Sequence, residues 1–340
     1  MTPRNITLIS YAVFVFVLVA IGALHLTASF VTVMFACLAL HKLNFWNRKW
    51  LAVLVFMILV AAVFFGFVLF LRNAIAELPD IVSNSIRGIV QYAKVHDIEL
   101  PFADNVDNLK DLAVDTVRSN LSYLQNFAKI ATKEFVFQVV AVVVSIGVFL
   151  NPELDRRAGT GAGAGTLYEL FYGEIARRFG SFFRSFERVM GAQLLISLIN
   201  TVLTSCFLVV CCLFYPRLTI YAGMVIILTF ACGMLPIIGN IVSNAFIVGL
   251  AFTVSPRMAV TALVFLVGIH KLEYFLNSKI IGGRIRHPMW LMLLALIAGE
   301  RLMGIPGIIL APVVLSFIKV EMTKYEVGPG GEVVEVSREG

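Results

Sequence analysis

The chain has 340 residues, of which 59% are hydrophobic and 14% are charged, and its formal net charge is +6. Soluble globular domains carry about 25% charged residues, so this composition excludes an ordinary soluble protein and indicates an all-α, polytopic integral membrane protein. The basic residues lie in short clusters between apolar runs, a pattern typical of cytoplasmic loops. We therefore expect the lipid bilayer as a partner and no nucleic acid.

The chain is expected to contain about eight transmembrane elements, because crossing the hydrocarbon core takes about 20 helical residues. The apolar segments 6–23 and 26–40 are short and are predicted to form a tight hairpin around His25, and 51–71 is a full span. The cluster 42–50 combines basic residues with tryptophans, which marks the cytoplasmic interface of a membrane. This assignment places both termini of the chain in the cytoplasm.

Changes in hydropathy and composition divide the chain into regions. In order, these are N-terminal transmembrane helices (1–72), an extracytoplasmic helical insert (73–133), a transmembrane helix (134–150), a cytoplasmic linker with an amphipathic helix (151–190), a transport core with two broken helical hairpins (191–320) and a polar cytoplasmic tail (321–340). The insert is polar and leans acidic, and its apolar residues recur from Leu109 at the spacing of a helix.

The helix at the end of the linker region has an apolar stripe and a basic face. Phe182, Phe186 and Met190 lie on the stripe, whereas Arg178 and Arg184 lie mostly off it. Two interpretations remain open. The helix either lies on the cytoplasmic surface of the membrane, where basic residues meet lipid headgroups, or it packs against other parts of the protein.

Two apolar segments of the transport core are interrupted by proline and glycine, at 236–239 and at 304–307. Proline removes a backbone donor and clashes with the preceding helical turn, and in hydrocarbon each freed backbone group needs a partner. Each break lies within a pair of short helical pieces that follows one full span, so the two breaks occupy corresponding places. This arrangement points to a transporter site between inverted repeats; the alternative is a pair of kinked helices without a site.

The breaks and the polar faces near them supply the predicted substrate pathway. The half-helix ends are expected to offer unpaired backbone groups to a substrate. The pathway residues are Pro236, Gly239, Asn240, Asn244, Gly304, Pro306 and Gly307, and a polar helix face is formed by Ser197, Asn200 and Thr201. Small polar residues also hold membrane helices together, so packing remains the alternative for each of them.

The predicted helix 258–277 carries candidates for coupling transport to an ion. His270, Glu273 and Asn277 are spaced at i, i+3 and i+7, which places them on one face. Ionisable residues inside a membrane are candidates for carrying protons or binding cations. The alternative is that these residues face water at the cytoplasmic end of the helix.

The sequence contains no recognisable catalytic motif, metal-ligand spacing or ATP-binding loop. We therefore expect a protein that is not an enzyme, with no cofactor and no metal site. Active transport without ATP must draw on a gradient, so the expected partner is a small-molecule or ion substrate.

Four motifs in order, LPIIGN, KLEYFLN, IIGGRIRHP and GIPGIILAP, resemble the autoinducer-2 exporter family of bacterial membrane proteins. The resemblance is strongest from Gly191 to Lys319. It implies an all-helical inner-membrane transporter that forms a homo-oligomer, a pentamer by the family pattern, and works by an elevator movement. Members are credited with exporting a small furanone-type signal, and some with sodium or lithium/proton antiport.

Three hypotheses for function follow. The leading one is a secondary transporter or exporter of a small polar solute, with the broken helices as its site or gate. The first alternative is a sodium or lithium/proton antiporter, in which Glu273 would be essential. The second alternative is a membrane scaffold that transports nothing, in which the extracytoplasmic helices are the working part.

Overall fold

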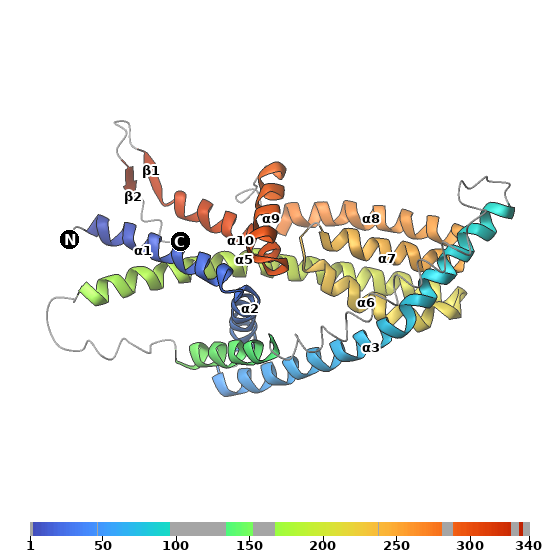
Figure 1. Cartoon of the computed structure of the whole chain (residues 1–340), viewed down its shortest axis with the longest axis horizontal. Coiled ribbons are helices and arrows are strands. Elements are labelled where there is room, and N and C mark those ends of the chain that lie inside the picture. Colours follow the sequence, from blue (N-terminus) through green and yellow to red (C-terminus); the bar gives the residue numbers. More distant parts are fainter. Residues whose placement is uncertain are drawn as a thin grey trace. The chain divides into compact units, whose positions relative to one another are not determined.

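The computed structural model describes residues 3–45, 47–95, 134–151, 167–236, 238–280, 288–327 and 333–335. Within these ranges the chain is helical (Figure 1), apart from turns and a small antiparallel pair of strands near the C-terminus. The prediction of an all-helical polytopic membrane protein is confirmed. Most of the predicted insert, residues 96–133, lies outside the described residues, as do 152–166 of the linker.

The elements follow in chain order. The helices are α1 (Pro3–Ala23), α2 (Thr27–Leu43), α3 (Lys49–Val95), the helix Glu134–Leu150, α5 (Leu167–Phe214), the short 3-10 helix η2 (Pro216–Leu218), α6 (Thr219–Gly233), α7 (Ile238–Val254), α8 (Pro256–Ile280), α9 (Met289–Met303) and α10 (Ile305–Met322); the strands are β1 (Tyr325–Val327) and β2 (Val333–Glu335). Four described segments are long and apolar enough to cross a membrane, namely Asn5–Ala23, Lys49–Gly66, Glu169–Phe214 and Ile305–Met322. Several shorter apolar helices accompany them.

The chain divides into two compact units. The first unit comprises Met1–Met57, Val136–Gly191 and Ile281–Gly340, and the second comprises Ile58–Phe135 and Ala192–Ile280. The helices α3 and α5 each contribute residues to both units.

The core of the first unit is aromatic and joins α1, α5 and α10. The ring of Phe14 lies 5.6 Å from that of Phe182 and 5.0 Å from that of Phe317, measured between centroids, and all three side chains are buried. Phe186 and Met190 of α5 are also fully buried. The apolar stripe of this helix therefore packs against protein, as in the second of the two interpretations.

Two details of the predicted helices differ from the structure. The amphipathic helix and the span expected after residue 190 are one continuous helix, α5, because nothing between them breaks the backbone. The turn from α1 to α2 is short, with His25 at a φ of 56°. After this turn α2 does not fold back along α1 (Figure 1), so the predicted tight hairpin is wrong.

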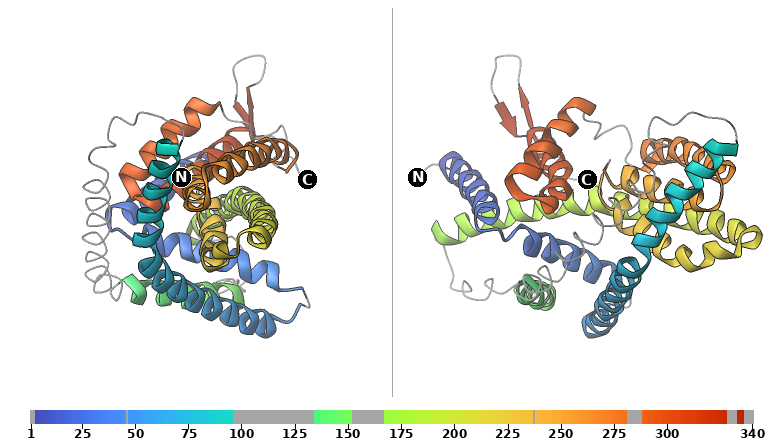
Figure 2. Two further views of the ribbon diagram at one scale, coloured as in Figure 1. Left: turned by 90° about the vertical axis from the view of Figure 1, so that its right-hand side faces the viewer. Right: turned by 45° about the vertical axis from the view of Figure 1, so that its right-hand side comes forward.

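The second unit is a helical bundle in which α6, α7 and α8 lie alongside the second half of α5 (Figures 1 and 2). Val225 of α6, Ile247 of α7 and Ala259 of α8 belong to one buried apolar cluster. Phe207 of α5 stacks on Phe265 of α8 with 4.1 Å between ring centroids. This packing fixes the faces that the four helices turn toward one another.

At the first predicted break the proline lies between two helices, whereas at the second it lies inside a helix. Pro236 lies between the end of α6 and the start of α7. Pro306, in contrast, lies in the first turn of α10, so the prediction that it is non-helical is wrong. A first-turn proline has no helical N–H bond to lose. The break there is made by Gly304, whose φ is 67° and whose ψ is −156°.

Both pairs of short helices approach closely at a glycine. A Cβ added to Gly239 would lie 2.5 Å from the carbonyl carbon of Cys232 and nearer still to its oxygen. A Cβ added to Gly307 would lie 2.6 Å from the carbonyl carbon of Gly299 and nearer to its oxygen. Real Cβ atoms do not approach backbone this closely, so these glycines allow each helix pair to close.

Candidate functional site

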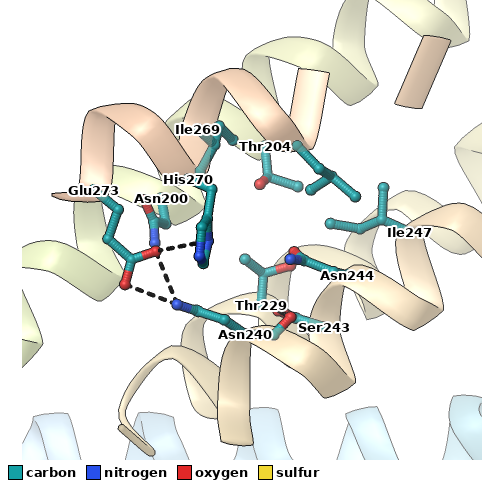
Figure 3. Close-up of a pocket in the computed structure, with 11 residues that line it drawn as sticks. Asn200, Thr204, Thr229, Asn240, Ser243, Asn244, Ile247, Ile269, His270 and Glu273 are labelled. Atoms are coloured by element: carbon teal, nitrogen blue, oxygen red, sulfur yellow. Dashed lines mark hydrogen bonds and ion pairs between the residues drawn. The ribbon is translucent and has the colours of Figure 1, made fainter. Parts of the chain in front are cut away.

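A cavity lined mainly by polar side chains lies inside the second unit, between α5, α6, α7 and α8 (Figure 3). Its lining residues are Asn200, Thr204, Thr229, Asn240, Ser243, Asn244, Ile247, Leu266, Ile269, His270 and Glu273. The cavity volume is about 10 Å³, which is about what one water molecule requires. In this conformation the cavity therefore accepts a species the size of water or of a bare monovalent ion.

The lining residues recur on one face of each helix. On α7, Asn240, Ser243, Asn244 and Ile247 follow the i, i+3, i+4, i+7 spacing of a single helical face. On α8, His270 and Glu273 lie on the corresponding face. Because α7 begins just after the Pro236 break, Asn240 falls in its first turn, opposite Glu273.

Asn240 holds the carboxylate of Glu273. Its Nδ2 donates to both oxygens, at 2.7 Å to Oε1 and 2.8 Å to Oε2. The amide nitrogen must be the atom that faces the carboxylate, since an ionised carboxylate only accepts hydrogen bonds. The Glu273 side chain is 13% exposed. One amide therefore fixes a largely buried carboxylate at the edge of the cavity.

His270 lies at the rim of the cavity. Its Nδ1 is 3.8 Å from Oε2 of Glu273, and its side chain is 70% exposed. This contact is an ion pair only when the imidazole is protonated. His270 thus lies beside Glu273 with most of its side chain exposed.

Asn200 presents an unpaired acceptor. The residue is 7% exposed, and among the described residues its Oδ1 has no hydrogen-bond partner. It lines the same cavity as His270 and Glu273 (Figure 3). An unpartnered buried acceptor costs about 1–3 kcal/mol, so a bound species that donates hydrogen bonds or carries positive charge would be stabilised there.

The end of α6 is bound by two side chains of α5. Gln193 Nε2 donates to the carbonyl of Gly233 at 2.7 Å, and Ser197 Oγ donates to that of Phe230 at 2.7 Å. Across the break, the amide of Gly239 donates to the carbonyl of Leu235 at 3.2 Å. The sequence predicts that the helix ends at this break offer unpaired backbone groups to a substrate. The carbonyls of Phe230 and Gly233 and the amide of Gly239 are instead bound by protein groups, so the prediction is wrong for these three groups.

The predicted site residues separate into those that line the cavity and those that do not. Asn200, Asn240, Asn244, His270 and Glu273 come together around it. Thr201 Oγ1 donates to the Ser197 carbonyl at 2.7 Å within its own helix. Four predicted residues of the second unit do not line the cavity, namely Ser197, Thr201, Pro236 and Gly239. The predicted residues Gly304, Pro306 and Gly307 belong to the first unit. The side chain of Asn277 lies outside the described part of the chain.

Sequence reasoning missed two polar residues that matter here. Thr229 lines the cavity from the apolar second half of α6 and donates to the Val225 carbonyl at 2.8 Å. Gln193 precedes Ser197 by four residues on α5, so an extension of the polar face by one turn would have found it. In the described ranges, no group of three or more His, Cys, Asp or Glu residues is placed to hold a metal ion.

Comparison with known proteins gives two findings. A family model described as "AI-2E family transporter" matches residues 6–326. The protein "Putative transport protein YdbI" of Bacillus subtilis (strain 168) is 27% identical over 246 residues, which cover 70% of this chain and 68% of that protein.

Proposed function

The chain belongs to the AI-2E family of transporters, and from this premise we propose that it is a secondary transporter whose pathway for a small polar solute runs through the cavity of α5–α8. The observation that carries the proposal is the Glu273 carboxylate, held by Asn240 in a cavity that is also lined by Asn200, whose Oδ1 has no hydrogen-bond partner among the described residues. Charged groups inside a membrane are costly and are retained at substrate and ion pathways.

The size of the cavity implies that it must open during transport. About 10 Å³ of space suits one water molecule, so a solute of several heavy atoms enters only when α7 and α8 separate. Separation breaks the two bonds from Asn240 to Glu273 and leaves both groups free to bind the solute. We propose that this exchange of partners is the opening step, and that the movement is the elevator type that the family resemblance implies.

Cation/proton exchange is the second candidate, and the small cavity favours it. Asn200 Oδ1, nearby hydroxyls and the Glu273 carboxylate are the oxygen ligands that hard cations prefer. A single carboxylate that binds either a cation or a proton would couple the two. In this scheme Glu273 carries the exchanged species itself, whereas in the solute scheme it only helps to bind it.

Flux through the purified full chain in proteoliposomes tests both candidates. We would measure uptake of radioactive sodium, the internal pH, and uptake of a panel of labelled polyols and sugars. Glu273→Gln is expected to abolish the flux that the unsubstituted chain shows. The matched control is Glu300→Gln, which removes a 52% exposed carboxylate on α9 and should leave flux unchanged. Equal flux in both variants would contradict the proposal.

Membership of a transporter family argues against the scaffold hypothesis. We further propose a bacterial inner-membrane location with both termini in the cytoplasm, and a homo-oligomer that is a pentamer; these rest on the basic clusters and on the family resemblance. A cysteine introduced at Asn105 should react from outside intact cells, and one at Ala162 should not. Both positions lie outside the described residues, and the opposite labelling would invert the proposed orientation.

A further inference from the structure

A buried charged cluster in the first unit joins three helices that are far apart in sequence. The Glu321 cluster consists of Tyr11 of α1, Arg178 and Ser181 of α5, Glu321 of α10 and Lys324 just after it. The side chains of Arg178 and Glu321 are 2% and 6% exposed. None of these residues lines the cavity of α5–α8, so the cluster needs an explanation of its own.

Each carboxylate oxygen of Glu321 accepts two hydrogen bonds. Oε1 accepts from Ser181 Oγ at 2.5 Å and from Lys324 Nζ at 2.5 Å. Oε2 accepts from the Tyr11 hydroxyl at 2.5 Å and from Arg178 Nη1 at 2.8 Å. A carboxylate has about four acceptor positions, so all of them are used and the three helices are held at one point.

Arg178 is fixed from two further sides. Its Nη2 donates to Glu174 at 3.0 Å, one turn earlier on α5, and its guanidinium lies 4.0 Å from the centre of the Tyr11 ring. One turn along the same three helices lies the aromatic core of Phe14, Phe182 and Phe317. The C-terminal end of α10 is therefore held by a charged layer and an aromatic layer together.

Among the described residues, the N-terminal end of α10 lacks such a buried charged or aromatic layer and follows a glycine next to exposed residues. Gly304 has a φ of 67° and a ψ of −156°, a region open almost only to glycine. Its neighbours Leu302 and Ile305 are exposed. A Cβ at Gly304 would meet no atom closer than 4.0 Å. Gly304 can therefore change its own dihedral angles without a local clash, although Leu296 of α9 packs in one buried apolar cluster with Ile308 and Ala311 of α10.

We propose that the Glu321 cluster is a fixed anchor for α10 and that Gly304 is the pivot about which α9 moves. Opening the cluster would leave Arg178 and Glu321 buried without their partners, which is strongly unfavourable. Rotation at Gly304 leaves no charge unpaired, because the contact that it opens, of Leu296 with Ile308 and Ala311, is apolar. The α9–α10 pair is thus held at one end and hinged at the other. This goes beyond the proposed function, which concerns the cavity of the second unit.

Amide hydrogen exchange of the full chain in lipid nanodiscs tests the anchor, and it needs no transport activity. Amides in 316–322 are expected to exchange at least about 100-fold more slowly than those in 301–305, because exchange follows local opening. Glu321→Gln should accelerate exchange in 316–322 by about tenfold or more, since it removes one charge of a buried pair. Peptides of α6–α8 should be unaffected.

Two further variants keep the test decisive. Glu187→Gln is the matched control, because it removes a partly exposed carboxylate of α5 that pairs with exposed Lys42 at 2.9 Å; it should change nothing in 316–322. Tyr11→Phe removes one hydrogen bond to Glu321 while keeping the ring, and it should give a smaller acceleration in the same peptides.

The anchor is refuted if 316–322 stays protected in both cluster variants, or if exchange rises equally throughout the chain. Equal protection at both ends of α10 in the unsubstituted chain would refute the pivot. A chain that shows the expected exchange but transports no probe would count against the proposed function and leave the anchor intact.

Discussion

Replacing Gly239 with alanine tests the tight contact that sets up the cavity. The added Cβ would lie 2.5 Å from the carbonyl carbon of Cys232, whereas ordinary van der Waals contact begins at 3.4 Å. The two helices must therefore separate by about 1 Å or more, and overpacking of this kind costs about 1–3 kcal/mol or more when backbone has to shift. We expect a loss of at least about 3 kcal/mol in the free energy of unfolding.

Transport should fall more than stability alone explains. Asn240 is the next residue, and a shift of about 1 Å stretches its bonds to Glu273, now 2.7 and 2.8 Å, beyond the usual limit of about 3.2 Å. The control is Gly249→Ala on the same helix, where a Cβ meets nothing within 4 Å; stability should rise by up to about 1 kcal/mol. Denaturant unfolding and flux per folded molecule would be measured on both variants. Equal stability and equal flux would refute the reasoning.

Three further predictions concern the breaks and the cavity. Pro306→Ala should change the free energy of unfolding by less than about 0.5 kcal/mol and leave flux unchanged, because a first-turn proline replaces no helical hydrogen bond; a large loss in denaturant unfolding would contradict this. Gln193→Ala should destabilise the chain by about 1 kcal/mol, since the Gly233 carbonyl loses its side-chain donor, and an unchanged unfolding midpoint would show that the bond contributes nothing. Asn200→Leu should stabilise the fold by removing the unpaired Oδ1 while it lowers flux; flux at the level of the unsubstituted chain would exclude Asn200 from the pathway.

The sequence identified the residues of the cavity better than it identified their partners. Asn240 is predicted as a pathway residue, Asn200 as part of a polar helix face and Glu273 as a coupling residue, because polar groups in an apolar helix are few and conspicuous. The bond between Asn240 and Glu273 joins residues 33 positions apart, and no local pattern records which side chains will meet. The same limit applies to Arg178, which looked like part of a basic surface until Glu321, 143 positions away, proved to be its partner.

The two proline motifs show why equivalent-looking sequences fold differently. A proline between apolar pieces predicts an interruption, and at Pro236 the helix does end. At 304–307 the same composition places proline inside the next helix, because Gly304 takes the positive φ that makes the break. Composition alone does not distinguish a proline that ends one helix from a proline that begins the next.

The most direct test of the central claim asks whether the cavity is the transport path. Ser243 is buried and lines the cavity from α7, and Ser243→Cys is close in size; the five native cysteines, all free, would first be replaced. If the path runs here, a small water-soluble thiol reagent should react with this variant and abolish flux in proportion to labelling. The control Ser205→Cys, on α5 outside the cavity, should keep full flux at any degree of labelling. Full flux in a completely labelled Ser243→Cys chain, or no reaction at all during transport, would contradict the claim.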